Sequence, residues 1–213
     1  MTADRFVRYS KPFVFLVCLV PMGLLVRKGV EGLLGANPIE VITHATGDWT
    51  LRFLCITLAI TPLRRVLGLP WLVRYRRMTG LFACFHGFLH FMTYIWLDQF
   101  FNVHSMVKDV AKRPFITAGF TAFVLMLPLA ATSTAGMIRR LGGRRWRILH
   151  RLIYVSACAG VIHYYWLVKA DETLPLRYAY VVGFLMACRV AFYLIDRRRP
   201  AGVPAAEHAE RVT

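Results

Sequence analysis

Six long apolar runs divide this sequence, and each is long enough to cross a lipid bilayer as a helix. The runs are about 18 to 24 residues long, and at about 1.5 Å per helical residue they match a hydrocarbon core of about 30 Å. They occupy residues 9–26, 49–66, 78–96, 115–138, 148–168 and 174–195. The sequence therefore predicts an all-α fold, a polytopic membrane bundle of six transmembrane helices.

The composition agrees with a membrane protein and argues against the other classes that a basic chain suggests. Hydrophobic residues make up 57% of the chain and charged residues 18%, which is little charge for the surface of a soluble domain. The net charge of +16 would suit a nucleic-acid-binding protein, but the arginines stand in short clusters between the apolar runs. The five cysteines include no Cys-x-x-Cys pair, so they predict neither a disulfide nor a zinc framework.

Charge is distributed unevenly between the loops that connect the apolar runs. The loops after the second and the fourth run each carry five arginines and no acidic residue, and three more arginines follow the sixth run. The other loops mix basic and acidic residues. By the positive-inside rule, the arginine-rich loops and both chain ends are expected in the cytoplasm. This predicts a cytoplasmic N-terminus over residues 1–8, a transmembrane domain over 9–196 and a disordered cytoplasmic tail over 197–213.

Histidines lie inside two of the predicted helices, where an ionisable side chain is costly and needs a reason. His86 and His90 are on the third helix, and His150 and His163 are on the fifth. Counting about 1.5 Å per residue from the cytoplasmic ends places His90 about 18 Å and His163 about 22 Å into the bilayer. Two histidines at similar depth on different helices suit the axial ligands of one haem iron.

A second, inner redox centre is less completely specified. His150 lies about 3 Å from the cytoplasmic end of its helix, roughly 20 Å along the axis from His163. At that depth the third helix offers residues 76–78, Arg-Arg-Met, and His86 is about 12 Å deep, a poor match. The histidines thus predict haem b between His90 and His163, while the number of haems, one or two, and the role of His86 stay open.

Two arginines at helix ends are candidates for holding the acidic edge of a cofactor. Arg77 precedes the helix that carries His86 and His90, and Arg151 follows His150. The guanidinium fork suits a haem propionate or a flavin phosphate, whereas the alternative is that both side chains extend to the lipid headgroups. The His-x-x-x-His spacing also suits zinc or copper, so a histidine-lined small transporter or metal permease is an alternative function of a different class.

Three stretches of the sequence resemble a known family. They are TGDWTLRFLCITLAITPLRR at 46–65, RRMTGLFACFHGFLHFMTY at 76–94 and RRLGGRRWRILHRLIYVSACAGVIHYYW at 139–166. Their order and the chain length resemble the haem-binding membrane subunits of the bacterial periplasmic methionine-sulfoxide reductase system, in the ferric-reductase-like transmembrane group. The resemblance implies a six-helix b-type cytochrome of the bacterial inner membrane, with haem ligands at His90, His150 and His163. His86 stands where a tyrosine is expected in many relatives.

The resemblance also implies the direction of electron flow. Electrons would come from the quinone pool or a cytoplasmic flavin reductase and pass to a periplasmic molybdopterin-containing partner that reduces methionine sulfoxide in oxidised envelope proteins. The chain would then be an electron-transfer subunit rather than the catalytic one. The family is described as binding FMN, for which this sequence has no independent motif. A stand-alone ferric or quinone reductase of the same fold is the alternative within redox chemistry.

Overall fold

The computed structural model describes residues 3–169 and 171–198, and within these residues the chain is built from helices without a β-strand. The α-helices are α1 (Ala3–Val30), α2 (Pro38–Val66), α3 (Val73–Met92), α4 (Val103–Lys112), α5 (Pro114–Ala131), α6 (Ala135–Leu149), α7 (Leu152–Leu167) and α8 (Thr173–Arg198). A 3-10 turn, η1 (Pro70–Leu72), precedes α3, and a π-helical segment, η2 (Thr93–Asp98), extends it. The predicted all-α fold is confirmed.

The predicted number of six transmembrane helices is supported only in part. By length and hydropathy four helical stretches of the described chain suffice to cross a membrane, namely Ala3–Val30, Pro70–Asp98, Pro114–Ala131 and Thr173–Arg198. The shorter α7 is strongly apolar, and α2 has 29 residues but carries charged side chains along its length. Eight α-helices rather than six are present among the described residues, because α4 and α6 are additional short helices. The chain is a multi-pass membrane protein.

The helix break after α5 corrects the predicted bounds of the fourth and fifth runs. The fourth run was expected to continue to residue 138, but α5 ends at Ala131. Thr134 then caps the next helix by accepting a hydrogen bond from the Met137 N–H, so the following residues form the separate helix α6. α6 is kinked at Gly142, where φ is 73°, and α7 begins at Leu152 rather than at residue 148.

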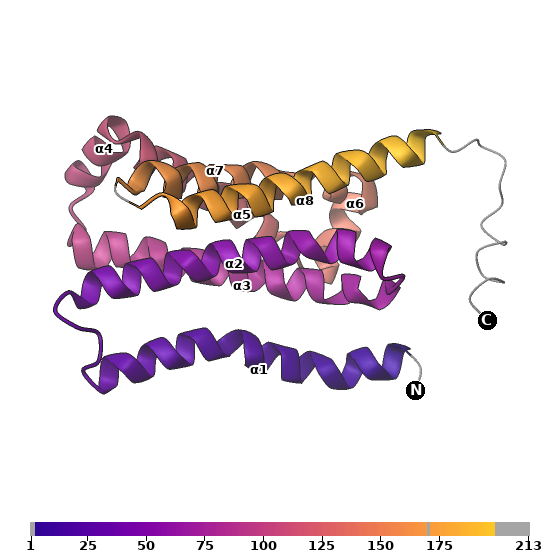
Figure 1. Cartoon of the computed structure of the whole chain (residues 1–213), viewed down its shortest axis with the longest axis horizontal. Helices are drawn as coiled ribbons and strands as arrows, with labels where there is room; N and C mark the ends of the chain where they lie inside the picture. Colours follow the sequence, from indigo (N-terminus) through magenta and orange to yellow (C-terminus); the bar gives the residue numbers. More distant parts are fainter. Residues whose placement is uncertain (1–2, 170, 199–213) are drawn as a thin grey trace.

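The helices form an elongated bundle with two different ends (Figure 1). α2 packs along α3 and α5 along α7, and these two hairpins are the most extensive helix pairings. α8 packs on α7 and α2, while α1 lies at the edge of the bundle next to α3. α6, the α2–α3 connection and the C-terminal end of α8 lie together, and we call this the arginine-rich end. α4 and the α1–α2 and α7–α8 connections lie at the opposite end, the α4 end.

Small residues allow helices of the bundle to pack closely. Ala83 on α3 and Ser156 and Ala157 on α7 have no exposed surface, and the Ser156 hydroxyl donates to the Ala122 carbonyl oxygen over 2.8 Å. Such close backbone approach is typical of helix packing in a membrane, where lipid removes the hydrophobic driving force between helices. Many large apolar side chains of α1 and α8 face outward, as expected for surfaces in contact with lipid.

Candidate haem site and its surroundings

The structure brings His90 on α3 and His163 on α7 together, although the two residues belong to different hairpins. Their ring centroids are 6.0 Å apart, and the ring planes make an angle of 73°. The pair lies near the α4 end, and His90 stands three residues before α3 continues into the π-helical segment η2. π-helical turns inside helices are frequent next to functional sites because they re-aim neighbouring side chains.

Each of these two rings is fixed by a backbone carbonyl of the partner helix in its own hairpin. His90 Nδ1 is 2.9 Å from the Thr43 carbonyl oxygen on α2, and His163 Nδ1 is 2.6 Å from the Phe115 carbonyl oxygen on α5. A carbonyl oxygen only accepts, so Nδ1 carries the hydrogen and donates it in both rings. The lone pair is therefore on Nε2, which makes no hydrogen bond in the described chain. Metal-ligating imidazoles are held in this way by carbonyl groups.

A glycine makes room for each ring, and the arrangement is the same in both hairpins. Gly47 lies one helical turn after Thr43, and Gly119 lies one turn after Phe115. A Cβ atom at Gly47 would stand 3.1 Å from His90 Nδ1, and one at Gly119 would stand 2.7 Å from His163 Nδ1. The absence of a side chain at these two glycines lets the imidazoles approach the helix backbone closely enough to reach the carbonyl groups.

The spacing of the two rings fits a shared metal ion. A metal–imidazole bond of about 2 Å, with about 1 Å more from the nitrogen to the ring centre, separates two axial imidazoles by about 6 Å. The described residues contain no group of three or more His, Cys, Asp or Glu side chains suited to a bare metal ion. Two histidines without further protein ligands match haem iron, because the porphyrin supplies the four equatorial nitrogens. The donor set thus fits haem better than zinc or copper.

His150 lies in a separate environment at the junction of α6 and α7. Its ring stacks on Trp146 with a centroid distance of 3.9 Å, and its Nε2 is 3.2 Å from the Thr132 hydroxyl oxygen. The Thr132 hydroxyl donates its hydrogen to the Pro128 carbonyl oxygen over 2.6 Å. Thr132 can therefore only accept from His150, which places the hydrogen of His150 on Nε2 and its lone pair on Nδ1.

His86 is buried between α2 and α3 and stands apart from the pair formed by His90 and His163. Its residue surface is 2% exposed, and its Nδ1 lies 3.0 Å from the Phe82 carbonyl oxygen of its own helix. Phe53 and Phe85 surround the ring, with centroids 5.1 and 5.3 Å away. Its Nε2 is buried and has no hydrogen-bond partner among the described residues. The structure places His86 in an apolar, aromatic environment.

The arginines that approach the bundle interior are not the two that the sequence singled out. Arg77 and Arg151 are exposed, whereas Arg76 and Arg189 are half-buried. Arg189 on α8 donates to the Leu58 carbonyl oxygen on α2 over 2.7 Å. The sequence does contain a signal for this contact: Pro62 follows Leu58 by four residues and has no N–H, so the Leu58 carbonyl needs a donor from elsewhere.

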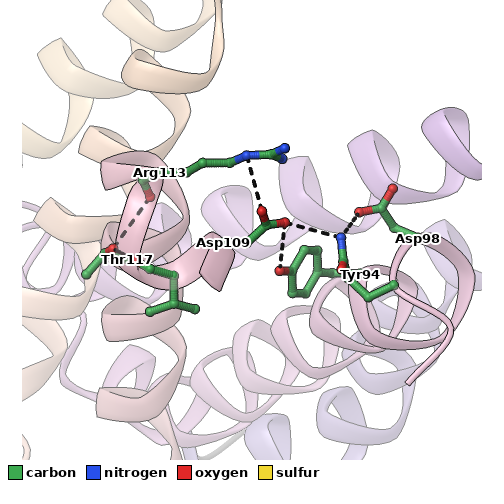
Figure 2. Close-up of polar contacts among 7 residues, drawn as sticks. Tyr94, Asp98, Asp109, Arg113 and Thr117 are labelled. Carbon is green, nitrogen blue, oxygen red and sulfur yellow. Dashed lines mark hydrogen bonds and ion pairs between the residues drawn. The ribbon is translucent and has the colours of Figure 1, made fainter. Parts of the chain in front are cut away.

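A polar cluster around Asp109 holds α4 against the neighbouring segments at the α4 end of the bundle (Figure 2). The Asp109 carboxylate accepts from the Tyr94 hydroxyl over 3.4 Å and from Gln99 Nε2 over 3.2 Å, and it lies 3.4 Å from Arg113 Nε. Figure 2 shows Asp109 between Arg113 on one side and Tyr94 on the other. These contacts tie α4 to η2 and to the start of α5, so they brace the end of the bundle nearest to His90 and His163.

Comparison with known proteins shows which family the chain is similar to. The family model for the ferric reductase like transmembrane component matches residues 46–161, which include His86, His90 and His150. The chain is 56% identical over 182 residues to the protein-methionine-sulfoxide reductase heme-binding subunit MsrQ of Herminiimonas arsenicoxydans, covering 84% of each chain. It is 52% identical to the MsrQ of Ralstonia nicotianae over 89% of this chain and 88% of the relative. The MsrQ of Rhodospirillum rubrum is 47% identical over 93% and 95%.

Proposed function

This chain belongs to the ferric-reductase-like transmembrane family and to its MsrQ branch, and we propose that it is the haem-binding subunit that carries electrons across the membrane to a protein-methionine-sulfoxide reductase. The identity to MsrQ proteins extends over most of the chain, which supports this assignment for the whole protein. The acceptor is a periplasmic molybdopterin-containing subunit that repairs oxidised proteins. The sulfoxide chemistry belongs to that partner, and this chain delivers the electrons.

The observation that carries the proposal is the pair formed by His90 and His163. Their rings are 6.0 Å apart, and both are held in the tautomer that leaves Nε2 free for a metal. We propose that these two residues would hold haem b through their Nε2 atoms. Haem b held there would supply one-electron redox chemistry. The Thr43 and Phe115 carbonyls orient the two rings, and the surrounding helices keep bulk water away from them.

The two ends of the bundle suggest its orientation. The arginine clusters 64–77 and 139–147 and the C-terminal end of α8 lie at the arginine-rich end, which we place in the cytoplasm of a cell with the chain in its inner membrane. In this orientation α1, α2, α3, α5, α7 and α8 are the six crossing helices, and both termini are cytoplasmic. The donor, the quinone pool or a cytoplasmic flavin reductase, approaches the arginine-rich end, and the acceptor approaches the α4 end. FMN binding rests on the family resemblance alone.

The surroundings of His150 favour a single haem site at His90 and His163, because Thr132 engages the Nε2 of His150 whereas the Nε2 atoms of the pair are free. A second haem at His150 would require either ligation through Nδ1 or a ring turn that breaks the hydrogen bond to Thr132. We therefore propose that His90 and His163 bind haem first.

The visible spectrum of the purified, dithionite-reduced protein tests this function. We expect a b-type α-band that disappears in His90→Ala and in His163→Ala. His44→Ala is the matched control, because this histidine is exposed and pairs with Glu40 of the same helix. A colourless wild-type protein from haem-replete cells, or an α-band that survives both substitutions, would contradict the proposal.

A further inference from the structure

α4 is held at the surface of the membrane by the two segments that flank it. The helical stretches Pro70–Asp98 and Pro114–Ala131 are both long and apolar enough to cross a bilayer. α4 begins at Val103, five positions after the first stretch ends, and it ends at Lys112, two positions before the second begins. With 10 residues α4 is about 15 Å long, which is too short for a hydrocarbon core of about 30 Å. α4 therefore lies at the bilayer surface, at the end of the bundle (Figure 1).

Contacts on one side of α4 fix which side faces away from the protein. The Asp109 carboxylate contacts Tyr94 on η2 and Arg113 just before α5 (Figure 2). The half-buried residues of α4 lie on this side, and they are Ser105, Met106, Asp109 and Val110. The other residues of the helix are exposed, and we call them the outward face of α4: Val103, His104, Val107, Lys108, Ala111 and Lys112.

The outward face combines an apolar row with a polar row, because residues four apart lie above one another on a helix. The apolar row consists of Val103, Val107 and Ala111, and its two valines are 67% and 64% exposed. The adjacent polar row consists of His104, Lys108 and Lys112. Neither lysine forms an ion pair in the described chain, and the only acidic residue of α4, Asp109, is on the opposite side. An apolar row beside unpaired cations is typical of helices that lie in the headgroup region of a membrane.

Two phenylalanines next to α4 are also exposed. Phe100 and Phe101 precede the helix, and 78% and 62% of their surfaces are exposed. Their φ angles are 47° and 59°, in the left-handed region that bulky side chains rarely adopt and that costs free energy. Trp96, at the end of the preceding span, is 62% exposed, and aromatic rings at such a position favour the membrane interface. Contact with lipid would give all three rings an apolar environment and so accounts for their exposure.

We propose that the outward face of α4, together with Phe100 and Phe101, is a binding surface for anionic phospholipid. The apolar row and the two rings contact the acyl chains, and Lys108 and Lys112 bind the phosphate groups of the headgroups. The short connections to both flanking spans favour lipid over a soluble partner protein, because they hold the apolar row against the bilayer. The bound lipid thereby keeps α4, and with it the contacts of Asp109, beside the helix end that carries His90.

Photo-crosslinking in vesicles identifies what contacts the outward face. The full-length protein carries p-benzoylphenylalanine in place of Val107, in vesicles of equal phosphatidylglycerol and phosphatidylcholine, with and without purified protein-methionine-sulfoxide reductase. We expect phospholipid adducts at a yield comparable to that of the same crosslinker in place of Tyr180, an exposed residue of α8. Adducts of phosphatidylglycerol should exceed those of phosphatidylcholine by about fivefold for each lysine. The crosslinker in place of Val103 gives the same measurement if the first variant fails to fold.

Charge variants test the role of the two lysines. Lys108→Gln combined with Lys112→Gln should remove the preference for phosphatidylglycerol, whereas Lys108→Arg combined with Lys112→Arg should keep it. Arg177→Gln is the matched control, because Arg177 is an exposed cation of α8 outside this face. The inference is overturned if the crosslinker captures no lipid, if it captures the reductase in place of lipid, or if the preference for phosphatidylglycerol is absent or survives the loss of both lysines. None of these outcomes depends on haem, so they leave the proposed function untouched.

Discussion

The pair formed by His90 and His163 and the single His150 are all hydrogen-bonded histidines, but their partners differ in chemical character. Backbone carbonyls can only accept, so they fix the hydrogen of His90 and His163 on Nδ1. The Thr132 hydroxyl is already committed to donating to Pro128, so it fixes the hydrogen of His150 on Nε2. The same residue type thus has a free Nε2 at one end of the bundle and a hydrogen-bonded Nε2 at the other.

The two ends also differ in charge. Near the α4 end the two paired rings contact backbone carbonyls and two glycines, and the Phe115 ring lies beside His163. Near the arginine-rich end, the guanidinium of Arg189 donates to the Tyr154 hydroxyl, and the side chain of Arg76 is half-buried. The paired histidines therefore lie among neutral groups, whereas the arginine-rich end places a guanidinium next to a tyrosine hydroxyl.

Substituting Gly47 and Gly119 gives the largest expected effect. It tests whether His90 and His163 must approach the helix backbone closely in order to hold haem. A Cβ at Gly119 would lie 2.7 Å from His163 Nδ1, closer than real Cβ contacts allow, so Gly119→Ala must displace the ring. A Cβ at Gly47 would meet His90 at 3.1 Å, which a small shift relieves. Haem per chain should therefore fall strongly in Gly119→Ala and less in Gly47→Ala, as measured from the pyridine haemochrome. Gly183→Ala, with open space around it, should retain haem like the wild type. Equal haem content in all three variants would refute the close-approach argument.

Removing Arg189 should destabilise the bundle near its inner site. Arg189→Met leaves the Leu58 carbonyl without a donor, because Pro62 cannot supply one, and a buried unsatisfied carbonyl costs about 1–3 kcal/mol. The fall in melting temperature of the detergent-solubilised protein measures this loss. Pro62→Ala restores an N–H four residues after Leu58, so the cost of Arg189→Met should be smaller in the Pro62→Ala background. An identical cost in both backgrounds would show that the carbonyl is not what Arg189 satisfies.

Replacing Thr132 tests whether its hydrogen bond to His150 Nε2 keeps this nitrogen unavailable to a metal. Thr132→Val removes the acceptor for His150 Nε2 at nearly constant volume, with an expected stability loss of about 1 kcal/mol. The outer haem should keep its spectrum, while any inner haem should be retained at higher occupancy because the His150 ring is released. Redox titration separates the two pigments by potential. A changed spectrum of the outer haem would mean that the two ends are not independent.

The smallest effect is expected at His86. His86→Phe removes a buried Nε2 that lacks a partner in the described chain and keeps an aromatic ring among Phe53 and Phe85. We expect unchanged haem content. We also expect a free energy of unfolding that equals the wild-type value or exceeds it by up to about 1 kcal/mol, and a melting temperature that is correspondingly equal or higher. Loss of haem in this variant would show that His86 contributes to the haem site after all.

Hydropathy was sufficient to locate the long helices, because each apolar run must satisfy its backbone polar groups internally. It did not detect the break between α5 and α6, since the Thr132–Thr134 turn is short and is made by side-chain capping rather than by charge. Hydropathy also did not indicate that Arg76 is half-buried while Arg77 is exposed. Neighbouring residues on a helix point about 100° apart, and only the packing of α3 against the bundle decides which side chain is turned inward.

For the site, helical depth alone placed His90 and His163 at similar heights, and the structure puts their rings 6.0 Å apart. Depth says nothing about the tautomer of a histidine, which depends on partners from α2 and α5 that are distant in sequence. The glycines at 47 and 119 were a usable signal, because a glycine within an apolar helix often marks a close approach. The engagement of His150 by Thr132 had no signal in the sequence.

The electron paramagnetic resonance spectrum of the oxidised protein tests the central claim most directly. If His90 and His163 are the two axial ligands of one haem, the wild type should give a low-spin ferric signal, since two imidazoles provide a strong axial field. His90→Ala and His163→Ala should each convert the remaining haem to the high-spin form or lose it, and added imidazole should restore the low-spin signal. A low-spin signal that persists unchanged in either variant would contradict the assignment of the haem to this pair.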